Sequence, residues 1–568
     1  RFSGLPEGRT APEMLRELVA QGLPQRYNPI TEEVRQRAEY ELEVIIGKHY
    51  ADYFLIVWDL SRWAHERGIP LSFRGSAGSS VVAYAIGIHD LDPIALNLVF
   101  ERFLNPERDD PPDIDLDVPD DTRGEIIRYA VERYGADRVA QVVTFGTLQG
   151  RAAVRDTGRA LDVPLAEVDR LAKLIPSMAT IDEGLEAQAE LRQLYQTDTR
   201  VAELIDNARA IEGLIRHAST HAAALVIAHK PLSELTPLMR HANDETITTQ
   251  YSMDALKKIG VEKLDLLGLK TLTVLRNTLM WIERTTGQKV KLDEVPPDDP
   301  ETFASLSRGE TSGVFQMESA GMRKLAVNLR PTSVAHLSAL VALYRPGPMK
   351  TGMLDAYVET SNGRRRIRYL HPLLEPILSV TYGVIVYQEQ VMQIARDLAG
   401  FSMGEADVLR RAMGKKQVDV MERMRPKFME GARQRGVPED TAKALFDTMA
   451  EFAGYCFNRP HSEAYARVAF QTAYLKTHYP AQFMAAQLSS YMDDKTKVAL
   501  YVEEARRLGV AVMPPDVNQS DADFTPNAEG QIRFGLAAVK GVGRAAVGAI
   551  LEARSAGPFR DIFDFCRR

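Results

Sequence analysis

The chain has 568 residues, of which 45% are hydrophobic and 26% are charged, a balance typical of soluble globular proteins. Its length predicts three or four domains, and the sequence lacks the uncharged apolar stretch of about 18 residues that a membrane span requires. Two cysteines, Cys456 and Cys566, exclude a disulfide framework, so we expect a reducing cytoplasm. The net charge of −7 does not exclude a nucleic-acid partner, because phosphate binding depends on local basic patches. Since Arg1 is not methionine and no signal peptide follows it, we expect an internal segment of a longer protein.

The first 70 residues are predicted to be helical, with amphipathic segments at 34–47 and 53–65. Small residues follow from Arg74 to Ser80, immediately before the apolar run 81–88. A loop of small residues that opens into a helix offers backbone N–H groups and the positive end of the helix dipole to a phosphate. An ordinary helix start without a ligand is the alternative.

Aspartate alternates with aliphatic residues between Pro112 and Val118. This period of two predicts a half-buried strand whose carboxylates share one face. The carboxylates belong to Asp113, Asp115 and Asp117, and the core-facing residues are Ile114, Leu116 and Val118. Three neighbouring carboxylates repel one another unless a cation lies among them, and Mg²⁺ prefers carboxylate oxygen completed by substrate phosphates. A solvated polar face on an edge strand is the alternative.

The segment 261–268 also alternates, and it places Lys263 and Asp265 on one face of a predicted strand. A buried, unpaired carboxylate costs several kcal/mol, so either a metal or Lys263 must compensate Asp265. We therefore expect this strand to bring a further carboxylate to the cluster. A phosphate loop and a carboxylate cluster that holds metal are the two halves of a phosphoryl-transfer site.

Helices are predicted at 123–134 and 151–161, and a small helical subdomain at 160–215. His217 and His221 follow, with serine and threonine between them. A metal site is the less favoured interpretation, because the sequence offers no third ligand at zinc-like spacing. Serine and threonine favour a turn here, and a polar contact to substrate or DNA is preferred.

From 271 to about 500 the sequence is predicted to be mostly helical, interrupted by short polar motifs. One motif contains Arg410, Arg411, Lys415 and Lys416 and suits a triphosphate or a nucleic-acid backbone. A second basic cluster lies at 364–368. Solvated helix ends are the alternative for both clusters.

A turn-rich segment, 516–530, leads to the last predicted unit. There the apolar-x-Gly-apolar-Gly pattern of 539–543 precedes a helix predicted at 544–554. The exposed N–H groups of such a hairpin can hold a DNA phosphate without reading sequence, which makes Gly541 and Gly543 candidate DNA contacts. A plain helix-start turn is the alternative.

Taken together, these motifs resemble the C-family bacterial DNA polymerases, the family of DNA polymerase III alpha subunits, over nearly the whole chain and in the family's order. The matching segments are Arg74–Ser76 with Ser80, Leu98–Arg108, Pro112–Asp117, Lys263–Leu269, Leu409–Lys416 and Asn458–His461. The resemblance implies that Asp115, Asp117 and Asp265 form the catalytic, metal-binding triad and that Asp113 supports it.

The resemblance also implies contacts to the incoming nucleotide and to DNA. The implied nucleotide contacts are Arg74, Gly75, Ser76, Ser80, Arg410, Arg411, Lys415 and His461. His461 resembles the residue near the sugar that discriminates against a 2′-OH, and Lys263 is expected to contact the primer strand. Two departures stand out, since Ser79 replaces a usual glycine and Arg459–Pro460 replaces a usual Lys-Ser pair.

The fold class implied by the resemblance is α/β and multi-domain: a nucleotidyltransferase-type palm with a mixed β-sheet, a helical thumb and large helical fingers. The expected ranges are 1–146 and 217–270 for the palm, 147–216 for the thumb, 271–500 for the fingers and 501–568 for the start of a clamp-binding region with its helix-hairpin-helix. We expect the PHP domain, the OB fold and proofreading to lie outside this chain.

The function implied is template-directed DNA synthesis by two-metal nucleotidyl transfer from a dNTP to a primer 3′-OH, with two Mg²⁺ ions. The expected partners are primer–template DNA and dNTP, joined in the full-length protein by a sliding clamp and other replisome subunits, with no membrane. Residues 107–113 are similar to the error-prone, translesion branch, whereas 458–480 are similar to the replicative branch. The alternatives are a translesion polymerase, a template-independent or RNA-making nucleotidyltransferase, and a non-catalytic DNA-binding fragment.

Overall fold

The computed structural model describes residue 2, residues 4–240 and residues 246–568. Residues 241–245, inside the range 217–270 expected for the palm, lie outside the described residues. The chain divides into two compact units, a first unit of residues 1–130 and 264–568 and a second unit of residues 131–263. Both units combine strands with many helices, which confirms the α/β, multi-domain class. The division into palm, thumb and fingers remains a prediction.

The N-terminal part of the first unit is helical around two short strands. Its elements are α1 Ala11–Arg26, α2 Glu32–Gly47, α3 Ala51–Glu66, β1 Ser72–Arg74, η1 Ala77–Ser79, α4 Val81–Ala85, α5 Phe100–Phe103, β2 Asp115–Val118 and α6 Arg123–Tyr134, whose end passes into the second unit. Helix α1 begins at a capping box, in which Glu13 N–H donates to the Thr10 hydroxyl and Thr10 N–H donates to the Glu13 carboxylate. The predicted helices at 34–47, 53–65 and 123–134 are confirmed.

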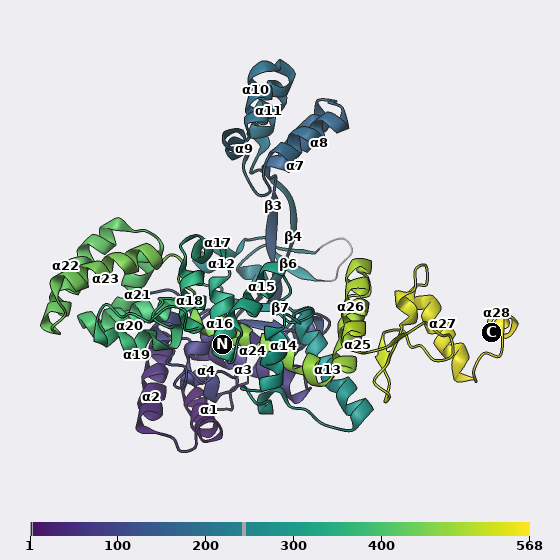
Figure 1. Cartoon of the computed structure of the whole chain (residues 1–568), viewed down its shortest axis with the longest axis horizontal. Helices are drawn as coiled ribbons and strands as arrows, with labels where there is room; N and C mark the ends of the chain where they lie inside the picture. Colours follow the sequence, from purple (N-terminus) through teal and green to yellow (C-terminus); the bar gives the residue numbers. More distant parts are fainter. Residues whose placement is uncertain (1, 3, 241–245) are drawn as a thin grey trace. The chain divides into compact units, whose positions relative to one another are not determined.

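The second unit is built on a long antiparallel ribbon of β3 and β4. Its elements are β3 Val139–Thr147, α7 Gly150–Ala160, α8 Leu165–Leu174, α9 Ile181–Ala187, α10 Ala189–Thr197, α11 Thr199–Ile211, β4 Ile215–Ile227, η2 Leu232–Glu234, β5 Leu238–Arg240, β6 Ile247–Thr249 and α12 Met253–Lys258. Helices α7–α11 stand at the far end of the ribbon around their own apolar core (Figure 1), which agrees with the helical segment predicted at 160–215.

The turn predicted between His217 and His221 is wrong. Both residues lie within β4, where pairing with β3 overrides the local preference of serine and threonine for turns. His221 Nδ1 accepts hydrogen bonds from the N–H groups of Ala223 and Ala224, beside the irregularity in the β3–β4 register. The ring of His221 therefore has a structural role in the strand.

The rest of the first unit is a set of packed helices, completed by one strand near its start and a small sheet near its end. Its elements up to residue 400 are β7 Lys263–Gly268, α13 Lys270–Thr286, η3 Leu292–Glu294, α14 Pro300–Ser307, α15 Ala320–Leu329, α16 Val334–Leu343, α17 Pro346–Lys350, α18 Met353–Ser361, η4 Pro372–Leu374, α19 Glu375–Leu378, η5 Ser379–Thr381 and α20 Gln388–Ala399. The remaining ones are α21 Met403–Gly414, α22 Val418–Gln434, α23 Glu439–Phe452, α24 Arg459–His478, α25 Pro480–Ser490, α26 Lys495–Arg507, β8 Val512–Met513, β9 Thr525–Pro526, β10 Ile532–Arg533, η6 Leu536–Ala538, α27 Arg544–Ser555 and α28 Ile562–Arg567.

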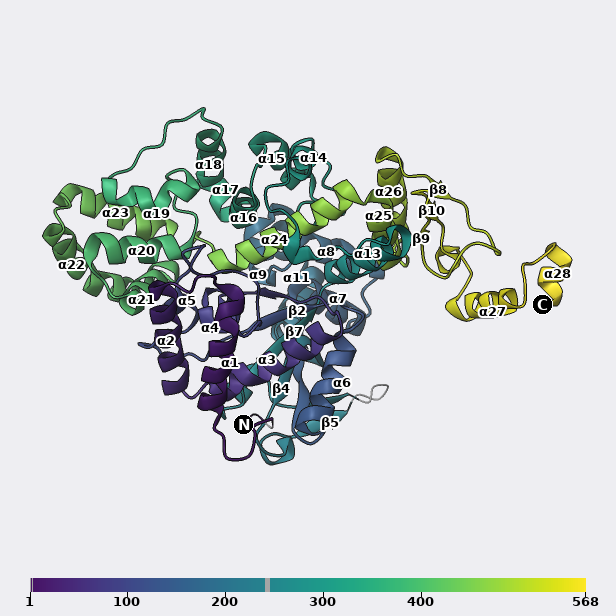
Figure 2. The ribbon, with the colours of Figure 1, turned by 90° about the horizontal axis from the view of Figure 1, so that it is seen from below.

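Helix α24 runs through the middle of the first unit (Figure 2) and contacts both α16 and the strand β1. One of its faces enters the apolar core that it shares with α16, where Ala466, Ala469 and Phe470 are buried. Another face carries His461 and Tyr465. A single buried helix therefore fixes the position of these two side chains relative to β1.

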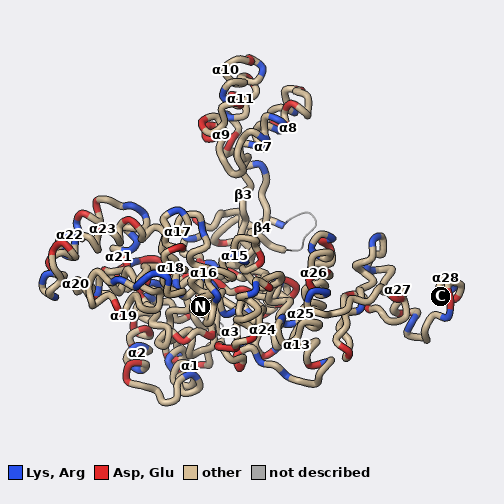
Figure 3. The backbone as a smooth tube through the Cα atoms, viewed as in Figure 1, with Lys and Arg blue, Asp and Glu red and all other residues tan. Residues whose placement is uncertain are grey.

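The first unit has the strand order β1-β2-β7, with β1 antiparallel and β7 parallel to β2. In the second unit β4 pairs with β3, β3 with β6 and β6 with β5. None of the helices in the described part of the chain is both long and apolar enough to cross a membrane. Lys and Arg are interspersed with Asp and Glu along each unit (Figure 3), so the local clusters described below matter more than the net charge.

Candidate active site

The aspartate strand forms where it was predicted, although its pairing begins three residues late, at Asp115. The preceding residues Pro111 and Pro112 have no N–H to donate to a ladder, and Ile114 N–H donates instead to the Tyr53 hydroxyl at 3.0 Å. The aliphatic residues Ile114, Leu116 and Val118 are each at most 3% exposed. The predicted alternation of core-facing and site-facing residues is therefore confirmed.

The strand register alone brings the charged residues together. Asp115 lies opposite Asp265 across the parallel β2–β7 pair and opposite Arg74 across the antiparallel β1–β2 pair. Directly paired residues on one face of a sheet lie about 5 Å apart. Two segments separated by about 150 residues in sequence thus supply one carboxylate cluster.

Arg74 is the cation that lies among these carboxylates. Its Nε is 3.5 Å from Asp115 Oδ2 and 3.8 Å from Asp117 Oδ1, and its Nη2 is 3.9 Å from Asp265 Oδ2. The side chain is 23% exposed, so it is accessible to a ligand at the site. Arg74 was expected to contact a phosphate, and the structure shows that it also offsets the repulsion between the aspartates.

Asp117 has an unusual environment for a carboxylate. It is fully buried, its Oδ2 accepts a hydrogen bond from the Tyr465 hydroxyl at 3.3 Å, and its Oδ1 has no hydrogen-bond partner among the described residues. Burial raises the pKa of Asp117 to about 6, although Arg74 and Tyr465 both act to lower it. A buried carboxylate oxygen of this kind is stabilised by a nearby cation.

The donor set fits a hard divalent cation. Asp113, Asp115 and Asp265 each place one carboxylate oxygen within 4.8 Å of the others. Opposite ligand oxygens of Mg²⁺ are separated by about 4.2 Å, so small side-chain rotations would bring them to coordinating distance. The structure therefore contains an acidic cluster that suits a hard divalent cation. It includes the exposed Asp113, which was expected only to support the site, and it does not include Asp117, which was expected to bind metal. The identity and number of the ions remain predictions.

The Gly-Ser loop divides into an accessible and a buried half. Gly75 and Ser76 are half-buried, and Gly75 N–H donates to His461 Nδ1 at 3.1 Å. Ser79 and Ser80, by contrast, are fully buried. In the predicted phosphate loop, Gly75 and Ser76 are therefore accessible, although Gly75 N–H is used by His461.

Glu41 is the reason why the helix start at Ser80 is not available to a phosphate. Its Oε2 accepts hydrogen bonds from the Ser80 hydroxyl at 2.8 Å and from Val82 N–H at 3.0 Å, and Ala83 N–H donates to Ser80 Oγ. The anion expected at this helix start is thus a carboxylate of the chain itself, so Ser80 stabilises the local fold. Sequence analysis missed Glu41 because its partners lie about 40 residues away.

His461 lies beside the Gly-Ser loop and is packed between two aromatic rings. Its ring is 4.4 Å from that of Tyr465 and 5.3 Å from that of Phe457, measured between centroids. Burial, together with the charge of Arg74, lowers the pKa of His461 to about 4. The imidazole is therefore neutral near pH 7, and its Nδ1 accepts from Gly75.

The departure at Arg459–Pro460 has a local explanation. Pro460 occupies the first turn of α24, where no N–H is needed, and Arg459 Nε donates to the buried Glu463 at 3.1 Å. Arg459 N–H donates to the buried Glu389. Both residues hold the start of α24 in place and do not point to a new ligand contact.

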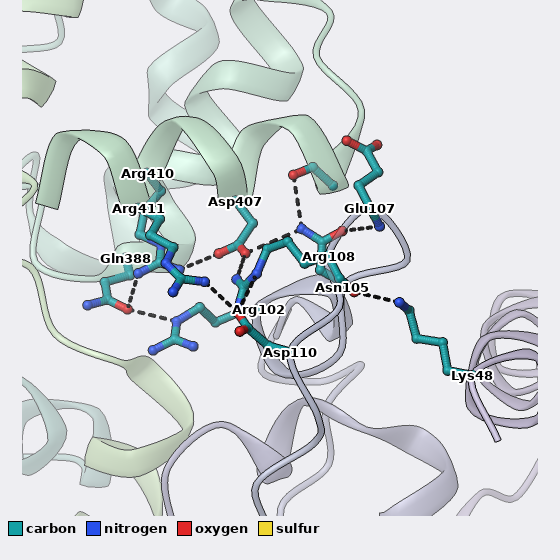
Figure 4. Close-up of polar contacts among 11 residues, drawn as sticks. Lys48, Arg102, Asn105, Glu107, Arg108, Asp110, Gln388, Asp407, Arg410 and Arg411 are labelled. Carbon is teal, nitrogen blue, oxygen red and sulfur yellow. Dashed lines mark hydrogen bonds and ion pairs between the residues drawn. The ribbon is translucent and has the colours of Figure 1, made fainter. Parts of the chain in front are cut away.

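The predicted triphosphate residues line a cavity of about 490 Å³, which we call the basic cavity. Figure 4 shows the polar contacts of several residues that line it. Its lining consists of Arg102, Arg108, Asp110, Gln388, Arg410, Arg411, Gly414, Lys415, Ala453 and Gly454. Five of these side chains are cationic. The structure thus brings the predicted residues of α21 together with two further arginines from the segment before the aspartate strand.

Two acidic residues that sequence analysis passed over organise the basic cavity (Figure 4). Asp407, which is fully buried, is paired with Arg108 and Arg410. Asp110 Oδ2 accepts hydrogen bonds from Arg411 and from two nitrogens of Arg108. Asp407 could have been found from its spacing of three residues before Arg410 on a predicted helix. Asp110 has no such signal, because its partner Arg411 is 301 residues away.

The predicted DNA contacts lie at element ends. Lys263 opens β7, two residues before Asp265. Gly541, with φ +86°, and Gly543 precede α27, and a Cβ at either position would meet open space. The helix predicted at 544–554 is confirmed as α27, whereas DNA contact at these residues remains a prediction.

Comparison with known proteins places this geometry in a family. Residues 13–268 match the bacterial DNA polymerase III alpha NTPase domain, 271–436 match the bacterial DNA polymerase III alpha subunit finger domain, and 509–568 match a helix-hairpin-helix motif.

Curated relatives agree with these matches. The DNA polymerase III subunit alpha of Bacillus subtilis is 44% identical over 566 residues, which cover 99% of this chain and 50% of that protein. The corresponding protein of Thermus aquaticus is 47% identical over 548 residues, which cover 94% of this chain and 45% of that protein. The corresponding protein of Chlamydia trachomatis is 45% identical over 571 residues, which cover 98% of this chain and 46% of that protein. The chain spans about half the length of the curated relatives it matches. It belongs to the family of bacterial DNA polymerase III alpha subunits.

Proposed function

We propose that this chain carries the nucleotidyl-transfer centre of a template-directed DNA polymerase, which adds a nucleotide from a dNTP to a primer 3′-OH. The observation that carries this proposal is the pairing of Asp115 with Asp265 on parallel strands, with Arg74 among the carboxylates. The relatives named DNA polymerase III subunit alpha support it.

Asp115, Asp117 and Asp265 are the proposed metal ligands, with Asp113 beside them. When bound there, two Mg²⁺ ions would activate the primer hydroxyl and stabilise charge on the transferred phosphoryl group. Asp115 and Asp265 are fixed by the strand register, so they need little reorganisation to hold a cation. The buried position of Asp117 beneath Tyr465 keeps its carboxylate oriented towards Arg74.

The phosphates are proposed to meet Arg74, the N–H group and hydroxyl of Ser76, and the cations of the basic cavity, while Gly75 N–H holds His461 in place. Guanidinium groups bind phosphate oxygens in a planar, often bidentate geometry, and Lys415 adds a point charge. His461 is held by Gly75 and Tyr465, and as a neutral ring it suits a contact to the sugar rather than to a phosphate. Ser80 is left out of this set because it is buried against Glu41.

DNA contacts are proposed at Lys263 for the primer strand and at the hairpin of Gly541 and Gly543 for the backbone. A sliding clamp and other replisome subunits are proposed partners of the full-length protein.

Primer extension with Mg²⁺ tests the proposal, using the parent chain, Asp115→Asn and a matched control, Asp298→Asn, whose carboxylate is exposed. We expect a loss of at least about a thousandfold for Asp115→Asn and none for the control. Extension by Asp115→Asn within about tenfold of the parent would refute the assignment. Parallel reactions with NTPs, without template and on damaged template separate the alternative polymerase types.

A further inference from the structure

The basic cavity already contains an anion that belongs to the chain. Of the described residues that line it, Asp110 alone carries a carboxylate. Its Oδ2 accepts from Arg411 Nη1, from Arg108 Nε at 3.0 Å and from Arg108 Nη2 at 2.5 Å (Figure 4). Three guanidinium N–H groups therefore converge on one oxygen, which is the arrangement in which arginines bind a phosphate oxygen.

We propose that Asp110 competes with the triphosphate for Arg108 and Arg411, so that it sets the affinity of the site for its nucleotide. This inference rests on the proposed function, since the ligand that it names is the triphosphate of a dNTP. Binding requires the carboxylate of Asp110 to leave the guanidinium groups and a phosphate oxygen to replace it. Asp110 therefore acts on the affinity for the triphosphate through the two arginines.

The two carboxylates of this region differ in how easily they can be displaced. Asp407 is fully buried and is held by Asn105 Nδ2 at 3.3 Å as well as by Arg108 and Arg410. The side chain of Asp110 is 42% exposed. Asp407 thus keeps the guanidinium groups in position, whereas Asp110 can turn into solvent without leaving a buried charge behind.

The backbone around Asp110 also permits this movement. Asp110 lies in the loop between α5 and β2 and is followed by Pro111 and Pro112. Proline has no backbone N–H group, so neither of these two residues donates a backbone hydrogen bond that a movement of the loop would break. The loop is anchored further back, where Lys48 Nζ donates to the Arg108 carbonyl.

The pair of variants Asp110→Asn and Asp109→Asn tests the proposal. Each removes one carboxylate from adjacent positions, but Asp109 is exposed and does not line the basic cavity. Because Asp110 is partly exposed, its competition is expected to be modest. We expect Asp110→Asn to lower the KM for dNTP by about three- to tenfold, with kcat changed less than about twofold. Asp109→Asn and Asp110→Glu are expected to keep the parental KM.

A second measurement does not depend on polymerase activity. Isothermal titration calorimetry with inorganic tripolyphosphate at low ionic strength reports the affinity of the cavity directly, since screening is weakest there. We expect Asp110→Asn to bind tripolyphosphate about three- to tenfold more tightly than the parent, with the thermal unfolding midpoint recorded to verify folding.

The outcomes separate the two proposals. If the parent extends primers while Asp110→Asn leaves both the KM and the tripolyphosphate affinity unchanged or weakened, the inference is overturned and the proposed function stands. An equal gain of affinity in Asp109→Asn would also overturn the inference, because the gain would then come from the loss of any negative charge in this loop. If no chain extends primers but Asp110→Asn binds tripolyphosphate more tightly, the competition stands and the proposed function fails.

Discussion

Replacing Arg74 by methionine tests whether one guanidinium offsets the repulsion within the aspartate cluster. Arg74 lies 3.5–3.9 Å from Asp115, Asp117 and Asp265, and two of these residues are buried. Methionine keeps most of the side-chain volume and removes the charge. Without Arg74, the carboxylates must either repel one another or take up protons, and both effects destabilise the folded chain at neutral pH.

The magnitude follows from the burial of the partners. Removing one member of a buried ion pair costs about 3–5 kcal/mol, and because the Arg74 side chain is 23% exposed we expect about 2–3 kcal/mol in EDTA. Mg²⁺ at a hundred times its dissociation constant adds about 2.7 kcal/mol to a folded state that binds it. Mg²⁺ stabilises both chains, so only a difference in affinity changes the deficit. The variant offers the cation a cluster without a competing guanidinium and should bind it more tightly, and each tenfold gain in affinity lowers the deficit by about 1.4 kcal/mol at saturating Mg²⁺.

Urea denaturation followed by tryptophan fluorescence suits this measurement. The three tryptophans, Trp58, Trp63 and Trp281, all lie in the first unit, so the signal reports the unit that contains the site. Arg276→Met is the matched control, because it breaks a partly exposed pair with Asp121 and should cost less than about 1 kcal/mol with no response to Mg²⁺. An Arg74→Met deficit that is the same in EDTA and in Mg²⁺ would refute the reasoning.

Three further predictions concern the same unit. Asp117→Asn should abolish primer extension and Mn²⁺ binding, whereas Asp113→Asn, at an exposed position, should retain both within about tenfold. Equal losses in the two variants would contradict the proposed ligand set. Burial lowers the pKa of His89 to about 4, whereas the pKa in the unfolded chain is about 6.5. Between these pH values the unfolded state binds more protons than the folded state. The free energy of unfolding therefore falls by up to about 3 kcal/mol as the pH drops from 6.5 to 4. In urea denaturation, His89→Gln should lose most of this fall in the free energy of unfolding between pH 6.5 and 4. An unchanged dependence on pH would contradict the prediction. Gly22→Ala would place Cβ 2.0 Å from the Ala85 carbonyl oxygen and should cost about 1–3 kcal/mol, whereas Gly47→Ala, which meets open space, should cost nothing measurable.

The sequence determined the elements whose pattern is local. Period-two alternation located the aspartate strand and named its buried residues, because side chains on a strand must point to opposite faces. Helical periodicity located α2, α3, α6 and α27 to within a few residues. The resemblance selected Asp115, Asp265 and Arg74, and the register of β1, β2 and β7 brings these three together.

Only the tertiary structure decided which long-range partner each polar group has. Ser80 was a plausible phosphate ligand until Glu41, from another helix, was seen to accept its hydrogen bond. The sequence assigned no role to Asp110, yet it meets Arg411 from 301 residues away. Such pairings depend on how separate helices pack against one another. That packing is determined by the apolar faces of the helices. The positions of the charged residues in the sequence therefore do not show which of them will meet.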